Sequence, residues 1–78
     1  MNLGNALFQL GKVPEAFSQY QKALRVNADS PPLHYDMGVA LEKLGRREEA
    51  IEQYEMALRI DPDFTAAQNA LARLSKGP

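Results

Sequence analysis

A chain of 78 residues with 45% hydrophobic and 24% charged side chains has the composition of one small globular domain, which argues against disorder. Nine Lys and Arg residues against ten Asp and Glu residues give a net charge of −1 with no basic stretch, so we expect no nucleic-acid partner. The absence of cysteine excludes disulfides and thiolate metal sites, and no apolar run is long enough for a membrane span or a leader, so we expect a cytoplasmic protein that binds no membrane.

Apolar residues recur at helical spacing along the whole chain, and no segment alternates with the period of a strand. Glycine or proline follows most of the apolar stripes, while Ser30 before Pro31 and the later Asp63 are good helix caps. We therefore predict an all-α fold. In chain order the helices cover roughly residues 1–11, 14–27, 31–44, 47–60 and 63–76.

The chain also repeats itself with a period of 34 residues. Thirteen positions of one period are identical to their counterparts in the next, where ordinary amino-acid usage would give roughly two. A fixed period of this length indicates an architecture in which each unit buries its apolar face by stacking on the next. The matched pairs include Gly4 with Gly38, Ala16 with Ala50, Tyr20 with Tyr54, and residues 23–25 with 57–59.

A glycine inside a predicted helix recurs at one phase of the repeat, at Gly4 and Gly38. Glycine in a helix costs up to about 1 kcal/mol relative to alanine, so its recurrence predicts that part of another helix comes close there. We expect Ala50 to face Gly38 at the closest approach of the two helices, with Leu41 and Tyr54 beside them. A tyrosine at this place can fill the remaining space and reach the rim with its hydroxyl.

This pattern resembles the tetratricopeptide repeat, a helix–turn–helix unit with the signature W-x2-L-G-x2-Y…A-x3-F…P. The second repeat matches it at Met37, Gly38, Leu41, Ala50, Tyr54 and Pro62, with His34 in the Trp place. The first repeat matches it at Leu3, Gly4, Leu7, Ala16 and Tyr20, with Ala28 in the Pro place. The resemblance implies a right-handed α-solenoid of antiparallel helix–turn–helix repeats. It gives one domain over 1–78: a first repeat at about 1–30, a second at about 31–64 and a capping helix at about 63–76.

The register of the first repeat suggests that the chain is cut from a longer array, because Met1 stands several residues inside the first helix of its unit. Such a cut would leave an apolar end without a neighbour, so we expect a weak homodimer. A monomer with one frayed terminal helix is the alternative. The residues of that end are Leu3, Leu7, Phe8, Val13 and Phe17.

No constellation of side chains indicates catalysis, a cofactor or a metal. His34 is the one histidine and has no clustered ligands, so packing at a repeat boundary explains it better. The glutamates between Arg46 and Arg59 read as a solvated helix face with i,i+4 pairing. We therefore expect no enzymatic activity and no cofactor.

In the family that this chain resembles, the first helices of successive repeats line a concave groove and the second helices form the convex back. Carried over position by position, the resemblance gives ten candidates for binding a peptide; the alternative is that they only form a solvated inner face. The candidates are Asn2, Asn5, Gln9, Tyr35, Asp36, Val39, Glu42, Lys43, Asn69 and Arg73.

A subset of the family holds the C-terminal carboxylate of a peptide with Lys, Asn and Arg at fixed groove positions. Asn5 matches one such Asn, but Val39 stands at the next, and the basic positions hold Met1, Pro32 and Ala70. We therefore do not expect this carboxylate clamp.

The function that we predict is a protein–protein interaction scaffold that binds a peptide or a helix of unknown identity in its groove. Two alternatives stay open. The chain could be a structural module whose repeats stack into oligomers, or the non-catalytic tetratricopeptide part of a larger enzyme such as a glycosyltransferase.

Overall fold

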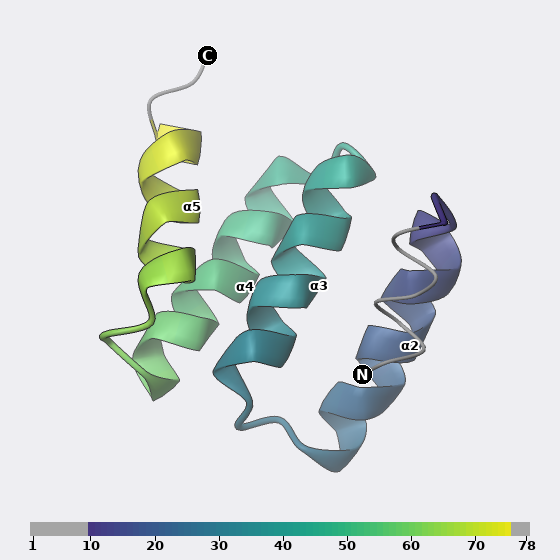
Figure 1. Cartoon of the computed structure of the whole chain (residues 1–78), viewed down its shortest axis with the longest axis horizontal. Helices are drawn as coiled ribbons and strands as arrows, with labels where there is room; N and C mark the ends of the chain where they lie inside the picture. Colours follow the sequence, from purple (N-terminus) through teal and green to yellow (C-terminus); the bar gives the residue numbers. More distant parts are fainter. Residues whose placement is uncertain (1–9, 76–78) are drawn as a thin grey trace.

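The fold, seen in a computed structural model that describes residues 10–75, is a row of antiparallel helices (Figure 1). The helices are α2 (Val13–Val26), α3 (Pro31–Lys43), α4 (Arg47–Ile60) and α5 (Thr65–Ser75), and no strand occurs in this part of the chain. Their ends lie within two residues of the predicted ones, and the all-α repeat fold is confirmed. The predicted helix over 1–11 falls almost wholly outside the described residues.

Helix α3 begins and ends where the sequence places its signals. The Leu33 backbone N–H donates to the Ser30 hydroxyl at 3.3 Å, with Pro31 in the first turn, so the predicted cap is confirmed. At the other end the Arg46 N–H bonds the Leu41 carbonyl at 2.8 Å and the Gly45 N–H bonds the Glu42 carbonyl at 3.0 Å. Gly45 has a φ of 78°, so this Schellman end needs the one residue that adopts a left-handed conformation without strain.

The start of α5 differs from the prediction, because Asp63 does not cap it. The Phe64 N–H bonds the Asp61 carbonyl at 3.0 Å and closes a turn, and the Asp63 N–H bonds the Asp61 side chain at 3.1 Å. The helix then begins at Thr65, and the Phe64 carbonyl accepts from the Gln68 N–H. The carboxylate that organises this loop is therefore the one before the proline, not the one after it.

The two loops that join one helix pair to the next are built alike. In each, the side chain of the residue that follows the helix accepts a hydrogen bond from the backbone N–H two positions on. Asn27 accepts from Asp29 at 3.3 Å, and Asp61 accepts from Asp63 at 3.1 Å. In each, a side chain of the following helix also bonds a loop carbonyl. His34 Nε2 donates to Ala28 at 2.7 Å, and 34 residues later Gln68 Nε2 donates to Pro62 at 2.7 Å.

The hydrogen-bond partners of the His34 ring explain why this side chain can be buried. Its exposed fraction is 5%, and its second ring nitrogen, Nδ1, lies 2.8 Å from Gln53 Oε1 on α4. A buried imidazole is costly unless both nitrogens have partners, and here both do. The prediction that His34 packs at the boundary between repeats is confirmed.

The core lies between the helices and uses alanine and tyrosine more than large aliphatic residues. Tyr54 is completely buried, and its ring supplies all three atoms nearest to Gly38: a Cβ there would come within 2.5 Å of the ring. The glycine thus marks a close approach as predicted, but the facing residue is Tyr54 rather than Ala50. The buried apolar residues are Ala16, Tyr20, Leu33, Met37, Ala40, Leu41, Ala50, Tyr54, Ala57, Ala67 and Ala70.

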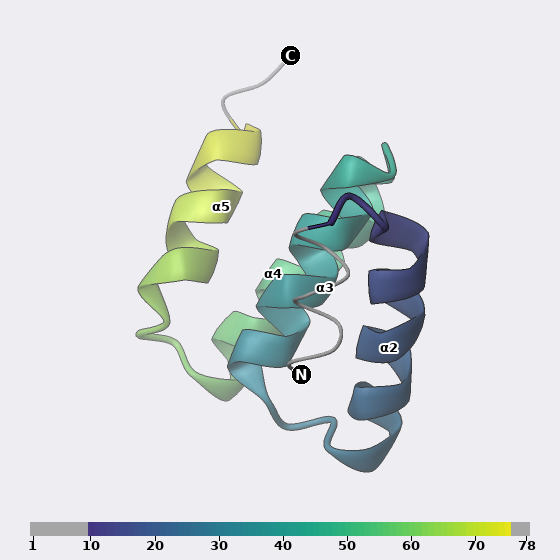
Figure 2. The same ribbon diagram turned by 45° about the vertical axis from the view of Figure 1, so that its right-hand side comes forward.

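The row of helices has α2 at one edge and α5 at the other (Figure 2). The inner pair, α3 and α4, is packed on both sides. Within the described residues none of the helices has both the length and the apolarity that crossing a lipid bilayer requires.

Candidate functional site

The five predicted binding residues of α3 share one side of the helix. At 100° per residue they fall on an arc of roughly 120°, and none of them is fully buried. The remaining circumference carries the buried residues of α3, which face the core. The periodicity of the sequence therefore placed these side chains on one face. They are Tyr35, Asp36, Val39, Glu42 and Lys43.

The two predicted residues of α5, Asn69 and Arg73, are both exposed. Arg73 reaches across to α3, where its guanidinium holds Glu42 in two parallel hydrogen bonds of 2.8 and 3.0 Å. We call this set of seven residues on α3 and α5 the binding face. The other three candidates, Asn2, Asn5 and Gln9, lie outside the described residues.

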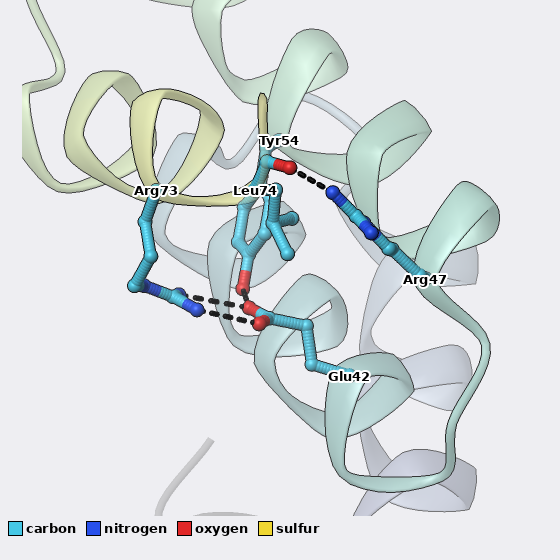
Figure 3. A network of polar contacts seen from close by, with 5 residues as sticks. All are labelled: Glu42, Arg47, Tyr54, Arg73 and Leu74. Atoms are coloured by element: carbon cyan, nitrogen blue, oxygen red, sulfur yellow. Dashed lines mark hydrogen bonds and ion pairs between the residues drawn. The ribbon is translucent and has the colours of Figure 1, made fainter. Parts of the chain in front are cut away.

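Glu42 is the centre of a polar network that joins three helices (Figure 3). Its carboxylate accepts from Arg73 of α5 and also from the hydroxyl of Tyr54 on α4. Nearby, the guanidinium of Arg47 at the start of α4 donates to the carbonyl of Leu74 on α5. The last turns of α5 are therefore held by two arginine contacts in addition to their apolar packing.

The network shifts the titration of its members in opposite directions. The hydrogen bonds from Arg73 lower the pKa of the Glu42 carboxyl below its ordinary value, although burial of that carboxyl acts the other way. Burial raises the pKa of the Tyr54 hydroxyl, and its hydrogen bond to the Glu42 carboxylate raises it further. At neutral pH the pair is thus an ionised carboxylate and a neutral phenol that donates to it.

Tyr35 holds a fixed aromatic ring on the binding face. Its ring centroid lies 5.6 Å from that of Tyr54 in a tilted pair and 5.9 Å from that of Phe64 in an edge-on pair. Among the described residues its hydroxyl has no hydrogen-bond partner, and no buried side-chain oxygen or nitrogen in that part of the chain lacks one, so solvent reaches this hydroxyl. The ring is therefore held in place while its polar tip stays open.

Asp36 is the half-buried carboxylate of the binding face. Burial raises its pKa above the ordinary value, and its charge in turn helps to raise the pKa of Tyr20 on α2. No ion pair joins Asp36 to another residue of the described chain. Its carboxylate lies at the edge of the face nearest α2, where its charge acts on Tyr20.

The sequence pattern predicted the seven residues as candidates but not the contacts among them. Glu42 and Arg73 were predicted as two separate groove residues, and they lie 31 positions apart on different helices. Tyr54 was predicted as core, with its hydroxyl free to reach the rim. Only the packing of α3, α4 and α5 brings these three groups together.

Two of the residues predicted to drive dimerisation are already engaged. Val13 and Phe17 pack against the core, and the guanidinium of Arg46 lies 5.7 Å from the centroid of the Phe17 ring. Arg46 also pairs with Glu49 three residues on, at 2.7 Å, rather than with an i,i+4 partner. Leu3, Leu7 and Phe8 lie outside the described residues, so the weak homodimer stays a prediction.

Comparison with known families agrees with the repeat geometry. A family model described as a TPR repeat matches residues 4–45, which is more than half of the chain, and one described as a tetratricopeptide repeat matches residues 31–64. No curated protein is similar enough to count as a match. The second match has the same bounds as the helix pair and loop that begin at Pro31 and end at Phe64. The chain belongs to the tetratricopeptide repeat family.

Proposed function

We propose that the binding face on α3 and α5 takes up an extended peptide or a helix from a partner protein. Tetratricopeptide repeats generally mediate protein–protein interactions. The observation that carries the proposal is the Tyr35 ring, which two other rings hold in place while its hydroxyl remains open to solvent. A fixed aromatic ring with a polar tip binds well because little side-chain freedom is lost on contact.

The rest of the face supports the same use. Val39 adds apolar surface beside Tyr35, while Asn69 and Lys43 are exposed and can bond the backbone or side chains of a ligand. The Glu42–Arg73 pair joins the two helices and favours one arrangement of the face before a ligand arrives. Preorganisation of this kind reduces the entropy that binding costs.

The same pair speaks against capture of a peptide's terminal carboxylate. Arg73 is the arginine of the binding face, and its guanidinium already satisfies a carboxylate of the chain itself. A ligand carboxylate would have to displace Glu42 and leave that half-buried acid without its main partner. We propose a non-catalytic module that binds the side chains and backbone of a peptide along the face, not a carboxylate clamp.

Selection from a random peptide library on the immobilised chain, followed by calorimetry of the selected peptides, tests the proposal. Replacing Tyr35 by Ala should weaken binding by about tenfold or more, as at an aromatic hot spot. Asn69→Arg, at an exposed position, should also weaken binding without disturbing the core. Glu52→Ala on α4 is the matched control and should leave the affinity unchanged.

Because Tyr35 packs on two rings, its variant must first be shown to be folded by circular dichroism. If both face variants bind every selected peptide as tightly as the original chain, the binding face is not the site.

A further inference from the structure

Two shallow hollows, each along the second helix of a repeat, are related by the 34-residue period. The first, of about 280 Å³, is lined by Gln21, Leu24 and Arg25 of α2 together with Met37 of α3. The second, of about 320 Å³, is lined by Glu55, Leu58 and Arg59 of α4. Each α4 position is the corresponding α2 position plus 34, so the same surface feature occurs once in each repeat.

These hollows lie away from the binding face. Met37, which lines the first hollow, is roughly 160° around α3 from Val39 at the centre of that face. Arg25 and Arg59 are exposed residues of α2 and α4, the helices that carry no member of the binding face. A ligand in the hollows would therefore occupy a different side of the molecule.

The arginines of the hollows differ from the other arginines of the described chain. Arg46 bonds Glu49, Arg47 bonds the Leu74 carbonyl and Arg73 bonds Glu42. Within residues 10–75, neither Arg25 nor Arg59 has a hydrogen-bond or ion-pair partner. Two uncommitted guanidinium groups thus stand at equivalent places of successive repeats, each beside a leucine.

Apolar side chains continue the pattern at the ends of the same helices. The residue after each arginine is aliphatic and exposed in both repeats, with 90% of Val26 and 39% of Ile60 open to solvent. Met56 of α4 is exposed to the same extent as Ile60. Three of the four large apolar residues that the described chain exposes therefore lie on α2 and α4, although Val26 and Ile60 are roughly 160° around their helices from Leu24 and Leu58 and lie outside the hollows.

We propose that the two hollows form a second docking surface, which binds an acidic, aliphatic segment of a partner protein. Carboxylates of the segment would accept hydrogen bonds from Arg25 and Arg59, whose planar guanidinium groups suit a carboxylate in two-point contact. Its aliphatic side chains would enter the hollows against Leu24 and Leu58.

The two hollows differ in their affinity for an acidic ligand. Gln21 lines the first, whereas Glu55 takes its place in the second and puts a negative charge one helical turn from Arg59. An acidic ligand is repelled by Glu55 and not by Gln21. The first hollow therefore binds the carboxylate more tightly, and Glu55→Gln makes the second resemble the first.

The test uses an end-blocked peptide of alternating aspartate and leucine, titrated into the 78-residue chain. The methyl NMR signals of the leucines and valines of the 78-residue chain are followed. We expect the Leu24 and Leu58 signals to shift, with Leu24 saturating first. The same peptide with asparagine for aspartate should bind several-fold more weakly, and added salt should weaken the acidic peptide alone.

The variants separate this surface from the binding face. Arg25→Gln and Arg59→Gln should each weaken the acidic peptide about two- to fivefold, the range for an exposed ion pair, and Glu55→Gln should strengthen it by a similar factor. Lys12→Gln removes an exposed cation at the start of α2, outside both hollows and the binding face, and should change nothing.

Three outcomes would each overturn the proposal. They are shifts confined to Val39 and the α5 leucines, no shifts up to millimolar peptide, and an affinity that neither arginine substitution changes. The arginine and glutamate side chains are exposed, so these substitutions leave the fold intact.

Discussion

The ring of Tyr54 occupies the space into which any side chain at Gly38 would project. A methyl group there would come within 2.5 Å of the ring, and the ring cannot easily retreat because it is buried and its hydroxyl is bonded to Glu42. Gly38→Ala should therefore destabilise the chain by about 1–2 kcal/mol, although alanine is the better helix former. Urea unfolding followed by circular dichroism measures it.

The same substitution in a Tyr54→Leu background tests whether the tyrosine ring causes the loss of stability. With Tyr54→Leu the ring is gone, so Gly38→Ala should become neutral or stabilising. Gly45→Ala serves as the control: nothing lies near that position, and its φ of 78° makes any side chain cost about 1–2 kcal/mol in both backgrounds. An equal cost of Gly38→Ala in both backgrounds would show that the ring is not responsible.

The Glu42–Arg73 contact should be measurable as a coupling between α3 and α5. Glu42→Gln and Arg73→Gln, alone and together, give a double-mutant cycle. Because 61% of the Arg73 side chain is exposed, we expect a coupling of no more than about 1 kcal/mol, reduced by salt. A coupling of zero at low salt would mean that the pair does not hold α5. In the single variants, hydrogen exchange should show the loss of amide protection first in α5.

Stability should fall at acidic pH through Glu42. Its pKa in the folded chain lies below the ordinary value of 4.5, so the stabilisation is fully present above pH 4.5 and is lost as pH falls through the folded value. Unfolding curves between pH 6 and pH 3 should show this, and Glu42→Gln should flatten that part of the profile. An acid limb of the same depth in the variant would assign it to other carboxylates.

The ionisation of Asp36 should change stability in the opposite direction from that of Glu42. Burial raises its pKa above the ordinary value of 3.8, so its ionisation costs stability as pH rises through the folded value. Asp36→Asn keeps the shape and removes the charge, and it should raise the Tm at pH 7 but not at pH 3. A lower Tm at pH 7 would show that a partner compensates the carboxylate.

The structure predicts that glutamine can replace the histidine at position 34. Gln68 makes the equivalent bond to the Pro62 carbonyl in the next unit, so His34→Gln should keep stability near that of the original chain. His34→Leu has similar bulk but no donor and should cost about 1–3 kcal/mol. Thermal unfolding compares the two. Equal losses would show that the ring's packing matters and its hydrogen bonds do not.

Much of the fold could be predicted because its signals are local. Gly45 and Ser30 mark helix ends by their backbone chemistry, and the helical period alone put Tyr35 and Val39 on one side of α3. The relative rotation and depth of two packed helices are not local properties. For that reason the sequence named Ala50 where Tyr54 faces Gly38, and it gave no sign that Arg73 would meet Glu42.

The choice between Asp61 and Asp63 shows a smaller failure of the same kind. Both precede a predicted helix and both are good caps by residue type. Neither of them caps α5: the chain turns over Pro62 and Asp63, the Phe64 N–H closes that turn on the Asp61 carbonyl, and the helix begins at Thr65.

The paired bonds from His34 to Ala28 and from Gln68 to Pro62 have a consequence for how such a chain can be lengthened. The junction between units is kept by geometry while its side chains and loop residues differ, so residues 27–34 and 61–68 should be interchangeable as cassettes. A copy of the unit inserted at either junction would form the same two hydrogen bonds as at its original place: one from a loop N–H to a side chain, and one from a helix side chain to a loop carbonyl. Growth of the array by duplication therefore requires no new contact at the loop, while a buried residue at position 34 also needs a partner such as Gln53 for its second polar atom.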